Sequence, residues 1–184
     1  MDFKYNPEKT VEAAALFLKW YGNPMKYMGL IKLLYMADRI ALDRLAEPIT
    51  GNQYVSMDYG PVLSEVLDLL HYGPDYDKDN PWLKYISAPK NYTVELLNDP
   101  GVDELCEAEE DIIREVYRNY GQLDRFYLAD LTHQIFPEWR NPYGSAIPIR
   151  IEDILRALGK SEEEIEEIHR HKEQENYLDL LLNN

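Results

Sequence analysis

The sequence predicts a mainly α protein: a single compact helical domain with one or two small β-hairpins on its side. Apolar residues recur at helical spacing through most of the 184-residue chain. Capping residues, prolines and glycines mark where helices begin and end. Only two short stretches, near residues 48–57 and 85–96, have the pattern of two strands joined by a turn. A chain of this length that is 45% hydrophobic can bury one substantial core.

The first two helices are predicted to form an antiparallel pair. Asn6-Pro7-Glu8 starts the first helix, because it supplies a capping side chain, a first-turn proline and an acid near the positive end of the helix dipole. Gly22-Asn23-Pro24 ends it. The second helix runs from Met25 to about Leu45 and is apolar on almost every side, which is typical of a helix in the middle of a domain.

The polar residues of this central helix divide into two groups. Lys32, Arg39 and Asp43 fall on one stripe, at spacings of seven and four, and are expected to be solvated. Asp38 instead shares a face with apolar residues. Burial of an unpaired carboxylate costs roughly several kcal/mol, so Asp38 must find hydrogen-bond donors or become neutral.

The segment after the central helix is predicted to form a short hairpin, or a loop that imitates one. Pro48 ends the helix, and Thr50-Gly51-Asn52 is turn chemistry before the extended Gln53–Met57 segment. Tyr59-Gly60-Pro61 then leads into a third helix that has this proline in its first turn and ends near Leu70.

The rest of the chain is predicted to contain a second small hairpin and four further helices. The hairpin joins Tyr85–Ser87 to Tyr92–Leu96. Residues 137–148 are expected to be a loop. The helices are expected over residues 103–120, 124–136, 151–158 and 161–182.

The last helix is predicted to differ in character from the others. The chain divides into a helical domain, residues 1–159, and an acidic C-terminal helix, residues 160–184. From Ser161, where a capping box opens the helix, the chain holds eight acidic and two basic residues. Ile165 and Ile168 are its early apolar anchors, and the stretch from Tyr177 to Leu182 is apolar again. A helix with so weak an apolar face can project from the body and dock on another protein.

Composition narrows the function classes. The net charge of −15 argues against direct binding of nucleic acid or of an anionic membrane surface, because both require Lys and Arg. It favours a basic partner, although acidity can also serve solubility alone. The single cysteine, Cys106, excludes an internal disulfide, and we expect a cytoplasmic protein. The sequence has no nucleotide-binding loop, nucleophile elbow or zinc pattern, so we expect no metal and no cofactor.

Two groups of motifs resemble a known family, the Panacea domain, also described as the SocA-like or GepA-like antitoxin-associated domain of bacteria and phages. The resemblance covers about residues 10–145. In one departure, the proline of Phe136-Pro137-Glu138 does not directly precede the tryptophan that follows. The matching residues are Lys32 to Arg39 (KLLYMADR), Pro48, Thr50-Gly51, Tyr54-Val55, Tyr59-Gly60-Pro61, Leu131-Thr132-His133 and Trp139.

The resemblance implies an antitoxin, not an enzyme, that neutralises a cognate toxin by direct protein–protein binding. The toxin is expected to be basic and encoded next to the antitoxin. A second hypothesis is an adaptor that hands a bound partner to a protease or holds a phage assembly. A third is a hydrolase that uses Asp38 and His133, which requires a pocket holding both side chains within hydrogen-bond reach.

The site hypothesis separates a partner-binding surface from a structural polar core. In the core, we expect Asp38 to accept hydrogen bonds from the loop after the central helix, and His133, near Trp139, to cap or bridge a helix end. The alternative is that Asp38, Tyr59 and His133 converge at a polar surface site. Tyrosine is favoured at interfaces, and the chain has fifteen. The predicted partner-binding residues are Arg39, Tyr54, Asp58, Tyr59, Ile165, Ile168, Tyr177 and Leu181.

Overall fold

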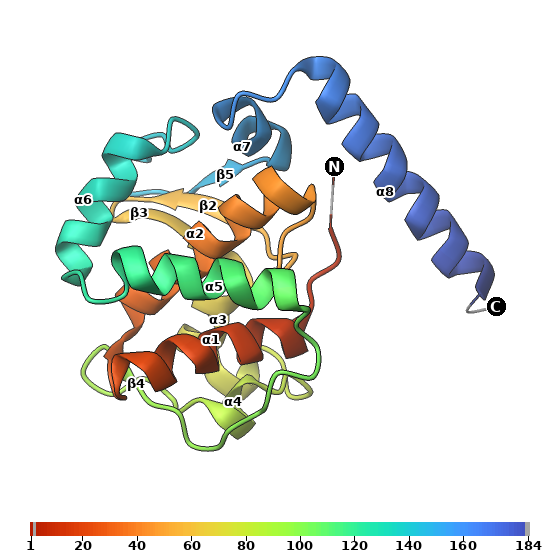
Figure 1. Cartoon of the computed structure of the whole chain (residues 1–184). Coiled ribbons are helices and arrows are strands. Elements are labelled where there is room, and N and C mark those ends of the chain that lie inside the picture. Colours follow the sequence, from red (N-terminus) through yellow and green to blue (C-terminus); the bar gives the residue numbers. More distant parts are fainter. Residues whose placement is uncertain (2, 183–184) are drawn as a thin grey trace.

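The computed structural model describes residues 1 and 3–182 and confirms the predicted class, mainly α with small antiparallel sheets (Figure 1). The helices are α1 (Pro7–Tyr21), α2 (Tyr27–Leu45), α3 (Ser64–Tyr72), the 3-10 helix η1 (Gly73–Asp75), α4 (Trp82–Tyr85), α5 (Glu107–Tyr120), α6 (Arg125–Ile135), α7 (Ile151–Ala157) and α8 (Glu162–Leu182). The strands are β1 (Met25–Lys26), β2 (Tyr54–Met57), β3 (Gly60–Leu63), β4 (Thr93–Val94) and β5 (Ile147–Ile149).

Helix α2 lies at the centre of the fold, as predicted. It contacts α1, α5, α6 and α7, and also β1 and β3, and every residue from Gly29 to Asp38 is buried. Figure 1 shows α1, α2 and α5 stacked through the body, with α6 along one side. The helix begins at Tyr27, later than predicted, because Met25 and Lys26 pair with β4 instead. The predicted start of α1 is confirmed, since the Asn6 side chain accepts from Lys9 N at 2.9 Å.

The β-structure after α2 differs from the prediction. The sequence predicts a hairpin within residues 48–57 and a helix from Pro61, but Gly60–Leu63 is extended and pairs with Tyr54–Met57. Helix α3 therefore begins only at Ser64. Strand β5 joins the other edge of β2, in a segment predicted to be a loop up to Pro148. The two errors have different causes. The β2–β3 hairpin turns at Asp58-Tyr59 and not at Thr50-Gly51-Asn52, whereas β5 is fixed by pairing with a distant segment, which local turn residues do not reveal.

The second predicted hairpin is partly formed. Ile86 pairs with Leu96, and Lys90 pairs with Thr93. Before this hairpin, however, Trp82–Tyr85 is one turn of helix, and β4 extends the pairing to β1.

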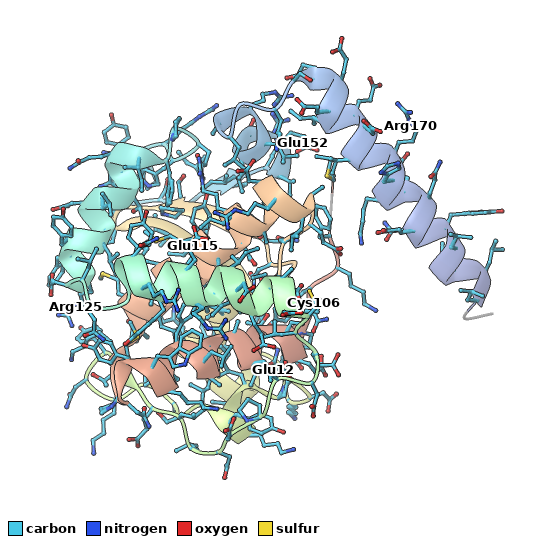
Figure 2. All side chains as sticks on the ribbon, in the orientation of Figure 1. Glu12, Cys106, Glu115, Arg125, Glu152 and Arg170 are labelled. Atoms are coloured by element: carbon cyan, nitrogen blue, oxygen red, sulfur yellow. The ribbon has the colours of Figure 1, made fainter. Side chains whose placement is uncertain are left out.

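The start of α5 is set by a contact with α1. The buried carboxylate of Glu12 accepts hydrogen bonds from the backbone N–H groups of Glu104 and Leu105 (3.0 and 3.1 Å to Oε2), which holds this segment outside the helix. Helix α5 consequently begins after its N-cap residue Cys106 and not at residue 103, as the sequence predicts. Figure 2 labels Glu12 and Cys106 at this end of α1 and α5.

Helix α8 begins at the predicted capping box and is packed only over its first half. Ser161 N donates to Glu164 Oε2 at 2.7 Å, and Glu164 N donates to Ser161 Oγ at 3.2 Å. Ile165 is buried and Ile168 packs against the core. Lys172 contacts the N-terminal segment and the turn after α2, and from there the helix runs away from the body (Figure 1).

No helix between residues 3 and 182 combines the length and the apolar character needed to cross a bilayer. Within the same residues, no group of three or more His, Cys, Asp and Glu side chains is placed to hold a metal ion.

Candidate functional site

Asp38 is the centre of a buried polar cluster between α2 and the loop that follows it. Its carboxylate accepts hydrogen bonds from Thr50 N at 2.9 Å, from the Thr50 hydroxyl, and from the Tyr54 hydroxyl at 2.8 Å. Burial raises the pKa of Asp38 to about 6, against the lowering effect of these hydrogen bonds. The contacts are those expected of a structural carboxylate that ties a loop to a helix.

This arrangement corrects the placement of Tyr54. The sequence predicts Tyr54 on the partner-binding surface, but its side chain is buried and its hydroxyl donates to Asp38. The reason is the pairing of β2 with both β3 and β5, which turns alternate residues of the strand toward the core.

The guanidinium group of Arg39 also interacts mainly with residues of its own chain. Its Nε donates to Glu138 Oε1 at 2.7 Å, and the same oxygen accepts from the Tyr35 hydroxyl at 2.9 Å. The guanidinium carbon lies 4.6 Å from the centroid of the Phe136 ring. Because its side chain is only 14% exposed, Arg39 offers little surface to a partner.

His133 fills the space between α6 and the β2–β3 turn. Its ring is stacked on Trp139 with 3.9 Å between centroids, and Trp139 Nε1 donates to the Met57 carbonyl at 3.0 Å. Burial and the nearby charge of Lys32 lower the pKa of His133. The lowered pKa favours the neutral imidazole, which stacks on Trp139 as an aromatic ring.

Asp38, Tyr59 and His133 do not share hydrogen-bond partners or a pocket. Asp38 is bound to Thr50 and Tyr54, whereas His133 lies against Trp139. The groove described next is lined by Tyr59 but by neither Asp38 nor His133. It thus does not supply the pocket that the hydrolase hypothesis requires.

A groove of about 440 Å³ opens between the start of α2, the β2–β3 hairpin, α3, the residue before β4 and the start of α6. Three aromatic side chains at this groove, Tyr59, Tyr92 and Phe126, are 58%, 70% and 49% exposed. Concave sites with apolar walls and a few polar groups are typical binding sites. The lining residues are Tyr27, Met28, Ile31, Lys32, Met57, Tyr59, Val62, Leu67, His71, Tyr92, Arg125 and Phe126.

Lys32 lies at the floor of this groove, and the prediction that it is solvated is wrong. Lys32 is 1% exposed because β3 covers this side of α2. Its Nζ donates to the Pro61 carbonyl at 2.6 Å. Desolvation lowers the pKa of Lys32 to about 7. Among the described residues, no carboxylate forms an ion pair with it. Of the other two stripe residues, Asp43 is exposed, as predicted.

The ionisable side chains of the groove are all basic or phenolic. Lys32, His71 and Arg125 line it, and none of the described Asp and Glu residues does. Figure 2 shows Arg125 at the outer edge of the fold, at the N-terminal end of α6, where its guanidinium carbon lies 4.7 Å from the centroid of the Phe126 ring. In a chain of net charge −15, this groove is lined by three basic residues.

Gly60 holds the hairpin against Lys32, and its substitution is expected to destabilise the fold. It has φ +92°, and a Cβ would collide with the Thr132 hydroxyl oxygen and lie 3.1 Å from Lys32 Nζ. Backbone strain and overpacking together predict a loss of about 2–3 kcal/mol for Gly60→Ala. Urea unfolding can measure this against Gly144→Ala, which has φ +84° but open space around the added carbon and should lose only about 1 kcal/mol. Equal losses would contradict close packing at Gly60.

The remaining predicted site residues are distributed over three places. Asp58 is exposed in the β2–β3 turn, and its carboxylate accepts from Gly144 N at 2.9 Å. Ile165 and Ile168 contact the core, whereas Tyr177 and Leu181 are exposed near the end of α8.

Sequence reasoning found Tyr59 but missed the rest of the groove. The sequence predicts a solvated Lys32 and gives Phe126 no role in the site. Phe126 is exposed within the first turn of α6, where an apolar ring beside Arg125 was a usable signal.

Residues 30–140 match the sequence model of the family described as Antitoxin SocA-like, Panacea domain. The matched region contains every groove residue except Tyr27 and Met28. Comparison with curated proteins and with solved structures gives no significant match.

Proposed function

The chain belongs to the antitoxin SocA-like, Panacea domain family, and we propose that it is a cytoplasmic antitoxin that neutralises a cognate toxin by binding it directly. The observation that carries the binding mode is the groove within the matched region, with Tyr59, Tyr92 and Phe126 exposed around it. Clustered exposed aromatic side chains are typical anchors of protein–protein interfaces. The groove therefore replaces the surface around Arg39 and Tyr54 as the proposed contact site.

The charge of the chain favours a basic toxin. A net charge of −15 creates a negative field that accelerates encounter with a positively charged protein and disfavours acidic partners. Helix α8 contributes a strongly acidic surface to this field, while Tyr177 and Leu181 offer apolar contact near its end. We propose that the second half of α8 forms a second part of the toxin-binding surface.

A truncation after Lys172 tests the contribution of α8. This chain keeps Ile165, Ile168 and the contacts of Lys172 with the body, so it should fold normally. Loss of the exposed apolar end is expected to weaken toxin binding about tenfold. Truncation at Gly159 would be less informative, because it also removes the buried Ile165. Undiminished affinity of the chain ending at Lys172 would remove α8 from the interface.

Co-expression with the product of the adjacent reading frame tests the proposed function. Growth arrest by that product alone, relieved when this chain is also expressed, is the expected result. Purification should then recover a stable complex that contains intact toxin. Relief of arrest through disappearance of the toxin would instead favour the adaptor hypothesis, and no relief would contradict the antitoxin proposal.

A further inference from the structure

We propose that the groove holds a carboxylate of the toxin against Lys32, with the apolar part of the same toxin segment packed between the aromatic walls. This inference rests on the proposed function and specifies the chemistry of the toxin segment that enters the groove: an acidic residue flanked by apolar side chains.

The first argument is the state of Lys32. An ammonium group has three N–H donors, and the structure shows one acceptor for it, the Pro61 carbonyl at 2.6 Å. Lys32 lines the groove and is 1% exposed, so a desolvated amine lies beside the groove. A carboxylate would supply the missing acceptors and the opposite charge.

The second argument is the absence of an internal counter-charge. The chain has 34 acidic residues, yet none of the described ones lines the groove or pairs with Lys32. Arg125 and His71, both basic residues, line the same groove. A buried charge without a partner is unfavourable. A carboxylate of a bound protein would supply the missing counter-charge.

The third argument distinguishes a peptide carboxylate from a polyanion. The walls are mainly Tyr, Phe, Met, Ile, Leu and Val side chains, which suit an apolar segment better than a polyanion. The −15 charge of the chain would also repel a nucleic acid. A toxin that is basic as a whole can still place one acidic residue here. Long-range attraction depends on the net charge of the toxin, whereas binding in the groove depends on the residues in direct contact.

The groove chemistry can be tested before the toxin is identified. The probes are 3-phenylpropanoate and its neutral amide, 3-phenylpropanamide, titrated into the full-length protein and followed by NMR. The acid is expected to bind at least about tenfold more tightly than the amide, and Lys32→Met should abolish that preference. Lys84→Met is the matched control, since this exposed lysine lies over the Tyr85 ring outside the groove. Equal binding of acid and amide, or a preference that survives in Lys32→Met, would overturn the inference.

The toxin itself provides a second test. Each Asp and Glu of the toxin is changed to its amide and combined with Lys32→Met in a double-mutant cycle. We expect one toxin carboxylate whose removal has no further effect once Lys32 is absent. If the wild-type chain binds the toxin but no carboxylate couples to Lys32, this inference fails and the antitoxin proposal stands. If the wild-type chain does not bind the toxin, the antitoxin proposal fails, and the probe titrations still decide the groove chemistry.

Discussion

Between pH 7 and pH 10, wild-type protein is expected to gain about 3–4 kcal/mol of stability from Lys32, and Lys32→Met is expected to remove that gain. Burial lowers the pKa of Lys32 from 10.5 to about 7, and a difference of one in pKa is equivalent to about 1.4 kcal/mol. From pH 7 to pH 10.5 the unfolded chain binds a proton that the folded chain lacks, so stability rises with pH. Below pH 7 both states are protonated, and the full cost of burying the charge remains.

The same reasoning predicts that Lys32→Met is more stable than wild type at pH 7, by about 2–3 kcal/mol after allowance for the lost hydrogen bond to Pro61. Urea unfolding followed by tryptophan fluorescence at pH 7, 8.5 and 10 measures both effects. Lys84→Met, which removes an exposed lysine, should follow the wild-type pH profile. A Lys32→Met protein that is less stable than wild type at pH 7 would contradict the account of Lys32 as a buried, uncompensated amine.

Asp38→Ala is expected to lower the free energy of unfolding by about 3–5 kcal/mol. Removal of the carboxylate leaves Thr50 N, the Thr50 hydroxyl and the Tyr54 hydroxyl without their acceptor in the core. The loop after α2 would then lose its main attachment to the helix. Asp43→Ala on the exposed side of α2 is the control and should change stability by less than about 1 kcal/mol.

The pH dependence of Asp38→Asn tests the ionisation of this carboxyl. Its folded pKa, raised from 3.8 to about 6, lies above the unfolded value. The folded chain therefore holds an extra proton between these values, and the stability associated with that proton is lost as pH rises from about 4 to 6. The neutral amide has no such loss, so Asp38→Asn should be less damaging at pH 8 than at pH 5. A larger loss at pH 8 would show that the ionised carboxylate is the stabilising form.

The helices were largely predictable because their signals are local. Asn6 caps α1, Asp124 caps α6 by accepting from Phe126 N, and Ser161 with Glu164 forms the capping box of α8. Each signal depends on residues within one turn of helix, so no knowledge of the tertiary fold is needed.

The sheet and the groove were less predictable, because β5 and the groove depend on distant segments and the local β2–β3 hairpin competes with a helical start at Pro61. Pro61 is an acceptable first-turn residue of a helix, but pairing with Ser56 places it in a strand. Strand β5 pairs with β2 across more than eighty residues of chain. The burial of Lys32 follows from β3 lying along α2, and the periodicity of α2 alone does not contain that contact.

Lys32 is an exception to the general rule that lysine side chains extend to solvent, and such exceptions can indicate a functional site. Its position breaks the expectation that lysine reaches water, and no residue of the described chain compensates its charge. Such departures are expected at functional sites, where stability is reduced in favour of binding. Lys32→Met is expected to be more stable than wild type and to lose carboxylate binding. One variant would thus show that Lys32 lowers stability and supports binding.

The most direct test of the groove as the toxin-binding surface is the Kd of the purified toxin for two matched double variants, measured by isothermal titration calorimetry. Tyr59→Ala/Phe126→Ala removes two exposed rings at the groove, and Tyr127→Ala/Tyr143→Ala removes two exposed rings outside it. The groove variant should bind about 100-fold more weakly than wild type, and the control variant should bind within about threefold of it. Equal affinity of the two double variants would contradict the proposal that this groove holds the toxin.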